Sequence, residues 1–471
     1  MTGWSGRLAI LAVSSALFIQ FVDQTALSTA LPTLARAFGT DPVNLKLALT
    51  SYMMIQALVI PASGWIADRF GARRIFVVAM VLFTVGSILC GLSRSLGTLV
   101  LFRLVQGTGA ALLTPVARMI VVGGSRREDL VRAMLLLTTP AMVGPLVGPP
   151  LTGLILKVAD WPWIFYINVP IGVLGVAAVM RFVPRLRQPH PGKFDLVGFV
   201  LLALALGGAI GLAETIGFPL ISWHAQLAAG IVAIAAGFGF AAHLRSAKNP
   251  VIDLRLLRLP SFRASMAGGV FPRLAFGGTP LLLPLLMQVG LGWSALEAGG
   301  LFVASAVGAL FARALSPPLI DRFGFRRVLG WGVVAVGAAT VVPGFFRPET
   351  PVVLMVGVLF LTGLFRSSMF NAINTIAYAE TPAKSVSAAT TFYAVVQQLS
   401  LSLGVTLGAL SLQGARLLYG GRLTPDSFII PFAVIGAVTV LGAPVFFRLH
   451  PQVGANLARR NRIAAESSAA G

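Results

Sequence analysis

The sequence predicts an all-α integral membrane protein built from two related halves. Hydrophobic residues make up 56% of the 471 positions and charged residues only 11%, whereas soluble domains carry about a quarter charged residues. The string DRFGARR at Asp68 to Arg74 returns as DRFGFRR at Asp321 to Arg327, each time between two long apolar runs. A repeat of this kind in membrane-spanning sequence is typical of transporters whose halves move against each other around a shared site.

Fourteen apolar runs are long enough to cross a membrane, because a hydrocarbon core about 30 Å thick needs about 20 such residues per helix. The predicted spans cover residues 8–31, 45–67, 75–93, 97–121, 132–157, 162–182, 194–214, 224–244, 261–290, 295–320, 327–346, 351–377, 385–411 and 427–448. Aligning the two DRFG loops pairs the first six spans with the last six and leaves the seventh and eighth unrepeated. We therefore expect fourteen transmembrane helices in a six-two-six order, with two pseudo-symmetric six-helix bundles.

The span limits predict four regions of the chain. These are a first six-helix bundle over residues 1–190, a two-helix insert over 191–250, a second six-helix bundle over 251–452 and a disordered cytoplasmic tail over 453–471. Lysine and arginine gather in alternate loops, and the positive-inside rule places those loops and both termini in the cytoplasm. The apolar run from Leu8 exceeds the core of a secretory signal, so it is expected to remain as the first span.

The basic net charge does not indicate a nucleic-acid partner. The chain carries a formal charge of +21, but this charge is divided among short loops instead of covering one face. Cys90 is the only cysteine, which excludes disulfides within the chain, and the four histidines lack metal-ligand spacing. No nucleophile, metal-binding or phosphate-binding motif of an enzyme occurs. We expect no nucleic acid, metal or cofactor, and favour a transporter over an enzyme or an uncoupled channel or sensor.

A very short inner loop, GWIADRFGARR, joins the second and third spans. Gly71 permits a tight turn, Gly64 allows a close helix approach, and Asp68 can pair with the neighbouring arginines or cap a helix. Positive charge alone would orient the spans, but orientation does not require a repeated order of Asp, Gly and Arg. The repeated set comprises Gly64, Asp68, Arg69, Gly71, Arg73 and Arg74 in the first half and Asp321, Arg322, Gly324, Arg326 and Arg327 in the second.

This loop resembles the signature loop of the major facilitator superfamily, whose members use it as a latch of the cytoplasmic gate. LFRLVQGTGAA, which contains Arg103, resembles the fourth-helix motif of that family. FVDQTALSTALP at Phe21 to Pro32 and WPWIFYINVP at Trp161 to Pro170 are similar to the first- and sixth-helix signatures of the 14-helix drug:proton antiporter branch. The resemblance covers nearly the whole chain and implies the major facilitator fold, within a group of bacterial multidrug exporters.

The resemblance also implies a function. The chain would be a secondary active transporter that exports drug-like small molecules from the cytoplasm by proton antiport with alternating access. We expect it in the bacterial inner membrane as a monomer, with a small-molecule substrate, protons and membrane lipid as its partners.

Asp23 is an acidic residue deep within a predicted span. A helix rise of about 1.5 Å per residue places it about 8 Å from the outer edge, and Arg103 of the fourth span about 9 Å deep. A carboxylate in lipid costs several kcal/mol unless it is paired or protonated, so an arginine at the same depth would hold it ionised, and loss of that partner would favour protonation. We predict Asp23 as the proton carrier and Arg103 as its switchable counter-ion, as the resemblance also implies. A static structural ion pair is the alternative.

The fifth predicted span contains VGPLVGPP, which resembles the antiporter motif of proton-driven exporters, a segment thought to seal the path against proton leak. Its residues are Gly144, Pro145, Gly148 and Pro149. Proline removes a backbone donor and kinks a helix, while glycine lets a neighbour approach closely. We therefore expect the motif to interrupt the span. A kink without a coupling role is the alternative.

Three arginines lie near mid-depth in spans of the second half, which offers no deep acid to neutralise them. An embedded cation without a protein partner indicates a water-filled cavity or an anionic ligand. Uncharged polar residues commonly form hydrogen bonds between helices, but together with the arginines they predict an electropositive substrate cavity. The predicted lining is Gln20, Arg273, Arg313, Arg366, Asn371, Asn374 and Gln397. A specific exporter of organic anions such as carboxylates is therefore the alternative function, with anion import a lesser one.

Overall fold

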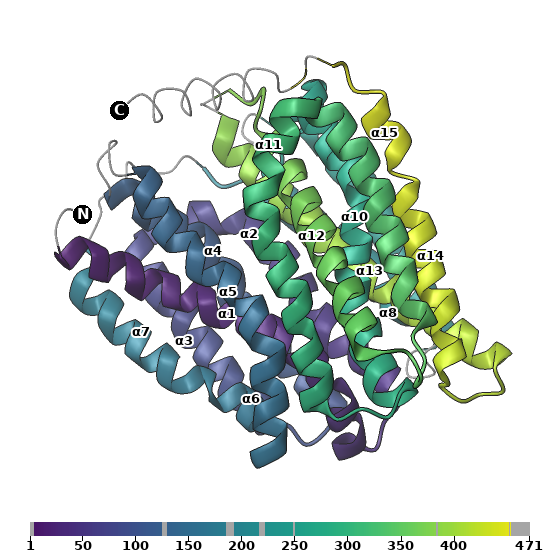
Figure 1. Ribbon diagram of the computed structural model, residues 1–471. Helices are drawn as coiled ribbons and strands as arrows, with labels where there is room; N and C mark the ends of the chain where they lie inside the picture. The colour runs from purple at the N-terminus through teal and green to yellow at the C-terminus, as the bar shows by residue number, and fades with distance from the viewer. Residues whose placement is uncertain are drawn as a thin grey trace, which may run out of the picture. The chain divides into compact units, whose positions relative to one another are not determined.

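The computed structural model describes residues 4–124, 130–184, 193–215, 222–247, 250–382, 385–451 and 453. Throughout these ranges the regular structure is helical, and no strand occurs in them (Figure 1). Eleven helices of the described residues are long and apolar enough to cross a membrane. The prediction of an all-α membrane fold is confirmed.

The eleven spans found among the described residues do not confirm the predicted total of fourteen. The tenth and eleventh predicted spans fall within one element, α11 (Ala295–Val341), whose helical backbone breaks at Gly324 with φ 73° and ψ 160°. Glycine adopts a positive φ readily because it has no Cβ, so the chain turns there within the DRFG sequence. Two shorter apolar stretches of the described residues, Val147–Val158 and Leu196–Leu212, belong to α5 (Leu130–Val158, 29 residues) and α8 (Leu196–Thr215, 20 residues). Fourteen crossings are therefore not confirmed and stay a prediction.

The chain divides into two compact units. The first comprises Met1–Val251 with Ser294–Gly299, and the second Ile252–Trp293 with Gly300–Gly471. The two helices of the predicted insert, α8 (Leu196–Thr215) and α9 (Trp223–Ser246), belong to the first unit. The predicted domain boundaries stay predictions, and residues 454–471 of the predicted tail lie outside the described residues.

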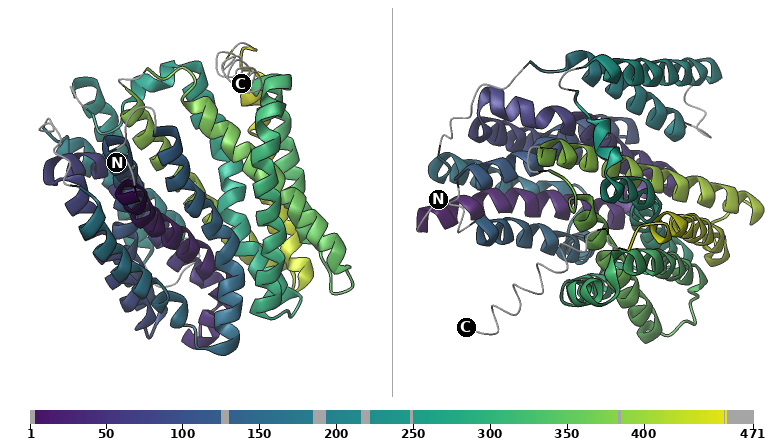
Figure 2. Two further views of the ribbon diagram at one scale, coloured as in Figure 1. Left: turned by 60° about the vertical axis from the view of Figure 1, so that its left-hand side comes forward. Right: turned by 90° about the horizontal axis from the view of Figure 1, so that it is seen from above.

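The first unit contains seven further helices. They are α1 (Trp4–Phe38), α2 (Lys46–Phe70), α3 (Ala72–Gly91), α4 (Leu96–Gly124), α5 (Leu130–Val158), α6 (Trp163–Tyr166) and α7 (Asn168–Phe182). Helix α1 packs against α5 and α7, α3 against α4 and α7, and α2 against α4 (Figure 1). Helices α8 and α9 pair with each other, and α2 contacts α8 (Figure 2). Trp65 of α2 also packs on Phe194, with ring centroids 5.0 Å apart, which attaches the insert to the bundle.

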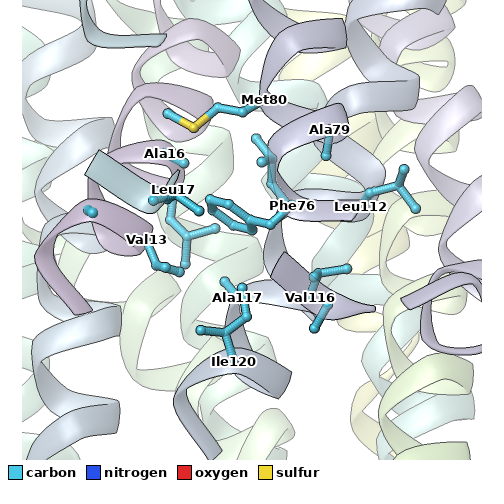
Figure 3. Close-up of a cluster of buried hydrophobic side chains, with 14 of the residues drawn as sticks. Val13, Ala16, Leu17, Phe76, Ala79, Met80, Leu112, Val116, Ala117 and Ile120 are labelled. Carbon is cyan, nitrogen blue, oxygen red and sulfur yellow. The ribbon is translucent and has the colours of Figure 1, made fainter. Parts of the chain in front are cut away.

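A cluster of buried apolar side chains joins α1, α3 and α4 (Figure 3). Phe76 of α3 contributes a fully buried ring, and Val13 and Leu17 of α1 and Leu112 of α4 belong to the same cluster. Lipid tails are as apolar as these side chains, so close packing, more than removal from water, holds membrane helices together. The cluster therefore fixes α1 and α4, the two helices that carry the predicted charge pair.

The sixth predicted span is divided into two helices, α6 and α7, which meet at Ile167. Pro170 lies in the first turn of α7, where its missing N–H leaves no helical hydrogen bond unmade. This change of helix places Asn168 at the beginning of α7.

The second unit is arranged around α10. Its helices are α10 (Pro260–Leu285), α11 from Gly300 onward, α12 (Val352–Ala377), α13 (Val386–Leu418), α14 (Ile429–Val440) and α15 (Ala443–Phe447). Helix α10 contacts α12, α13, α14 and α15. A Cβ on Gly277 would collide with the backbone of Leu401, and one on Gly404 with that of Leu274. The small residues thus let α10 and α13 approach backbone to backbone.

Candidate functional site

Asp23 of α1 and Arg103 of α4 form a buried ion pair. Arg103 Nη1 lies 2.6 Å from Asp23 Oδ2, and both side chains are 0% exposed. Sequence depth alone placed the two residues at the same level, and the structure brings them into direct contact. The predicted proton-carrying role is a separate statement, which the contact does not test.

The guanidinium of Arg103 is held from several sides. Its Nε donates to the Ala48 carbonyl at 3.2 Å, and its Nη1 also donates to Gln106 Oε1 at 2.6 Å. Its Cζ lies 4.0 Å from the centre of the Tyr52 ring, a cation–π contact. Helix α2 therefore supplies both a carbonyl and an aromatic face for an arginine that belongs to α4.

Asp23 receives two amide hydrogen bonds in addition to the arginine. Gln106 Nε2 and Asn168 Nδ2 both donate to Asp23 Oδ1 at 2.9 Å. The same two amides donate to Ser87 Oγ, at 2.8 and 3.2 Å. Ser87 in turn donates its own hydroxyl proton to the Phe83 carbonyl at 2.9 Å, so the donors and acceptors of the network are mutually consistent. The carboxylate is thus tied to α3, α4 and α7 as well as to its own helix.

Gly86 places the serine of this network against α4. A Cβ on Gly86 would lie 2.5 Å from the Gln106 Cα, closer than real Cβ contacts. Any side chain at position 86 would therefore push α3 and α4 apart and separate Ser87 from Gln106. Close approach of this kind is the usual role of small residues between membrane helices.

The energetics of the network favour an ionised and immobile pair in this arrangement. An isolated charge in a low-dielectric interior is very costly, and hydrogen bonds from neutral donors together with a counter-ion offset that cost. Removing one partner from a buried pair costs about 3–5 kcal/mol because the other charge is left uncompensated. A helix movement that parts α1 from α4 would expose Asp23 to the same cost, and binding a proton would relieve it.

Most of the residues around Asp23 were not predicted from the sequence. Gln106 and Asn168 lie within the quoted motifs, but neither was assigned to the charge pair, and Ser87 and Tyr52 were not singled out. Two amides within apolar runs were a usable signal, since polar groups in a membrane must find partners. A single serine among many gave no signal.

The predicted antiporter motif packs on the turns of α1 that flank Asp23. A Cβ on Gly144 would lie 2.9 Å from the Phe18 carbonyl, and one on Gly148 would lie 3.0 Å from the Val22 carbonyl. Pro149 is buried, and the side chain of Pro145 lies outside the described residues. The expected interruption is wrong: α5 stays helical from Leu130 to Val158, because membrane helices tolerate proline. The glycines instead allow α5 and α1 to approach closely.

The first DRFG loop forms the turn between α2 and α3. Gly71 adopts φ 92° between the two helices, as a tight turn at glycine requires. Arg73 Nη2 donates to the Met180 carbonyl, which ties the start of α3 to α7. Asp68 Oδ1 is buried without a hydrogen-bond partner, and among the described residues no ion pair joins Asp68 to the loop arginines. The expected pairing of Asp68 is therefore absent from this part of the chain.

The rest of the repeated set shows the same pattern in both halves. A Cβ on Gly64 would meet nothing within 4 Å, so the expected close helix approach at Gly64 is wrong. Arg69 and Arg74 are exposed. In the second half, Asp321 Oδ1 is also buried without a partner among the described residues, and Gly324 carries the positive φ. The exposed arginines of that loop are Arg322, Arg326 and Arg327.

The residues predicted to line one substrate cavity have different environments. Gln20 is buried in the first unit, where it accepts a hydrogen bond from Thr114 Oγ1 at 3.3 Å. This bond joins α1 to α4 and is the helix-to-helix role that was the alternative to a place in the cavity. Arg273 is fully buried and Arg313 is exposed. The partly exposed members are Arg366, Asn371, Asn374 and Gln397. Among the described residues, no group of His, Cys, Asp and Glu is placed to hold a metal ion.

The fold and the buried pair place the chain in the class of multi-pass membrane transporters. It belongs to the Major Facilitator Superfamily, whose family model matches residues 13–244 and 265–469. The predicted family is therefore confirmed, as is the prediction that the chain is a transporter and not an enzyme.

Two relatives are similar in sequence to this chain over nearly its whole length. A protein of Klebsiella pneumoniae subsp. pneumoniae named "Putative multidrug resistance protein MdtD" is 34% identical over 474 residues, 97% of this chain and 98% of that protein. Its namesake in Escherichia coli O1:K1 is 33% identical and covers 98% of both chains. The MdtD-type multidrug resistance proteins are thus close relatives of this transporter.

Solved structures share the fold. A bacterial homolog of the human lysosomal transporter Spinster, inward-facing and occupied, matches with a TM-score of 0.66 at 16% identity over 98% of each chain. A mutant of the nucleoside transporter NupG matches with a TM-score of 0.64 at 15% identity, over 93% of this chain and 98% of that one. At such identities the likeness concerns the fold alone.

Proposed function

We propose that the protein is a secondary active transporter that exports drug-like small organic molecules from the cytoplasm in exchange for protons, by alternating access. The observation that carries this proposal is the fully buried Asp23–Arg103 pair, whose carboxylate has three donors from neighbouring helices. The name of the MdtD relatives supports multidrug export as the task.

The coupling step follows from the contacts of Asp23. In the present arrangement Arg103, Gln106 and Asn168 stabilise the ionised carboxylate. When α4 and α7 move away from α1, the carboxylate loses these donors within the membrane and binds a proton instead. Their return expels the proton. Because the same movement rearranges the helices of the first unit, proton binding and substrate access are linked.

The finer architecture belongs to the same proposal. We place fourteen spans in a six-two-six order, with both termini in the cytoplasm of a bacterium and the chain acting as a monomer in the inner membrane. The domain limits would be 1–190, 191–250, 251–452 and 453–471. The two DRFG loops would act as the cytoplasmic gate, and the glycines of α5 would seal the proton path beside Asp23.

Transport by inside-out bacterial vesicles under an imposed pH gradient tests the proposal. Wild type should accumulate a cationic dye and dissipate the gradient as it does so, because proton release and substrate movement are coupled. Asp23→Asn removes the titratable group but keeps the shape, so gradient-driven accumulation should fall to the background. Glu349→Gln, the same chemical change in an exposed turn of the second unit, serves as the control. Undiminished coupling in Asp23→Asn would refute the carrier role.

Export of organic anions is the second candidate function. It is favoured by Arg273 and Arg366, for which no acidic partner occurs among the described residues. Embedded cations of this kind attract anions, whereas exporters of lipophilic cations are expected to carry deep acids in the same place.

A further inference from the structure

Arg273 of α10 is a fully buried cation, and residues of its own helix surround its guanidinium. Its side chain turns back along α10, and Nη1 donates to the Ser265 carbonyl at 3.3 Å, two turns earlier. A Cβ on Gly269 would lie 2.9 Å from this Nη1 and 3.1 Å from the Cζ. A side chain at position 269 would therefore force the guanidinium out of this position.

Neighbouring helices complete the surroundings of Arg273. Its Cζ lies 4.7 Å from the centre of the Tyr393 ring of α13, so the ring covers one face of the guanidinium. Ser265 Oγ donates to the Ile373 carbonyl at 2.8 Å and fixes α12 beside the same turn. The Tyr393 hydroxyl is itself buried without a hydrogen-bond partner among the described residues.

Two of the three guanidinium nitrogens lack a partner in the described part of the chain. These are Nε and Nη2 of Arg273, both buried. They form one edge of the planar group, with parallel N–H bonds whose spacing matches the two oxygens of a carboxylate. The nitrogen that is satisfied, Nη1, lies on the other side. A buried polar edge without a partner is costly, and this edge has the shape of a bidentate carboxylate site.

The acids of the second unit are committed elsewhere. Asp253 accepts from the Arg255 N–H, Glu380 from the Ser261 N–H, and Asp426 from Arg347. Asp321 lies in the DRFG loop and Glu349 in an exposed turn. Among the described residues, no acid of this unit reaches Arg273.

We propose that the Nε and Nη2 edge of Arg273 binds the carboxylate of the transported molecule together with the Tyr393 hydroxyl, which is also buried and unpaired among the described residues, and that substrates therefore include apolar carboxylates. This inference rests on the proposed transport function. The edge is enclosed in the present structure, so the carboxylate reaches it only when α12 or α13 moves away from α10. The aromatic ring of Tyr393 then supplies an apolar surface for the body of the substrate.

Equilibrium binding to the purified full-length protein tests the site without requiring transport. The probe is benzoate, and benzamide is its neutral isostere. Benzoate should raise the thermal unfolding midpoint of the wild type, because a ligand that binds only the folded state stabilises it, and benzamide should not. Arg273→Lys keeps the charge but lacks the paired N–H edge, so its affinity for benzoate should fall about tenfold or more. Arg347→Lys, in an exposed loop pair, should retain wild-type affinity.

A second variant keeps the site testable if Arg273→Lys fails to fold. Tyr393→Phe keeps the ring and removes only the hydroxyl, and should weaken benzoate binding by about fivefold to tenfold. Equal protection by benzamide, no protection of the wild type, or unchanged affinity in both variants would overturn the site. Asp23→Asn separates the two proposals: it should bind benzoate normally while losing gradient-driven transport. Intact dye export without benzoate binding would reject the carboxylate site alone.

Discussion

The two units each bury an arginine completely, yet the two arginines are satisfied to different degrees. In the first unit Arg103 has an acid, an amide oxygen, a carbonyl and an aromatic ring around it, and only its Nη2 is unpaired among the described residues. In the second unit Arg273 has one carbonyl and one ring, and its remaining edge is unpaired among the described residues.

This difference separates two uses of a membrane-embedded charge. Where a charge has its counter-ion on another helix of the protein, the pair depends on the positions of both helices, because moving the helices apart breaks it. A charge without a counter-ion inside the protein is balanced only when a ligand arrives. Burial alone does not distinguish these roles, and the inventory of partners does.

The largest effect is expected from unpairing Asp23. Arg103→Met removes the guanidinium but fills much of its volume, and leaves the carboxylate buried beside two amides. The free energy of unfolding should fall by about 3–5 kcal/mol, measured by thermal or denaturant unfolding in detergent. Arg273→Met should cost much less, or even stabilise, because it removes a cation that has no counter-ion among the described residues.

A double-mutant cycle makes this comparison decisive. Asp23→Leu combined with Arg103→Met removes both charges, so the double variant should be more stable than the sum of the single losses by about 1–3 kcal/mol. Additive losses would show that the two groups do not interact energetically, and the static contact would then carry no information about coupling.

Close helix contact beside the pair gives the next largest effect. Gly86→Ala forces a Cβ into the backbone of Gln106, so stability should fall by about 1–3 kcal/mol through overpacking. Transport should fall with it, because Ser87 and Gln106 are pushed apart. Gly357→Ala is the matched control on α12, where a Cβ meets nothing within 4 Å. Similar losses in both variants would mean that the effect reflects glycine replacement in general.

Asp23 and Arg103 were predictable because a charge within an apolar run is costly and must have a reason. Helix rise then gave their depth. The amides around them were not assigned, since the face of an apolar helix that meets a neighbour cannot be read when all faces are apolar. The division of the sixth span at Ile167, which places Asn168 against Asp23, also had no clear signal in the sequence.

The arginines of the second unit show that depth in the membrane does not predict which side chains share a site. Arg273, Arg313 and Arg366 were grouped because they lie at similar depth, but the structure leaves Arg313 exposed and encloses Arg273. Side-chain direction depends on helix rotation, which the apolar pattern does not specify. The tenth and eleventh predicted spans meet at Gly324, where the helical backbone of α11 breaks, while the total of fourteen spans stays a prediction.

The third largest expected effect is a change in selectivity between anionic and cationic substrates. The Cζ of Arg366 lies 5.9 Å from the centre of the Phe276 ring, one turn beyond Arg273 on α10. Arg366→Ala should raise the KM for a carboxylate by about tenfold, as loss of a charged partner does, while a cationic dye is affected little. Vesicle uptake of both compounds measures this, with Arg347→Ala as the control. Equal losses for dye and carboxylate would count against an anion role for the second unit.

The smallest effect concerns a partly exposed pair in the first unit. Asp195 accepts hydrogen bonds from the Gly198 N–H at 2.9 Å and the Val251 N–H at 3.3 Å, and lies 2.7 Å from His243 Nε2. Partial burial opposes its charge, but these hydrogen bonds outweigh that effect and lower the pKa of Asp195. A lowered pKa in the folded state means that the ionised group stabilises the fold above its ordinary value of about 3.9.

Asp195→Asn should therefore lower the free energy of unfolding by only about 0.5–1 kcal/mol at neutral pH. The contribution is lost as the pH falls below the ordinary aspartate pKa of about 3.9 and through the lowered folded-state pKa, so the difference from wild type should shrink in that range. Thermal unfolding of both proteins across this range measures it. A difference that stayed constant with pH would assign the effect to shape instead of charge. The contrast with Arg103→Met would then no longer measure how far burial amplifies the contribution of a hydrogen-bonded charge.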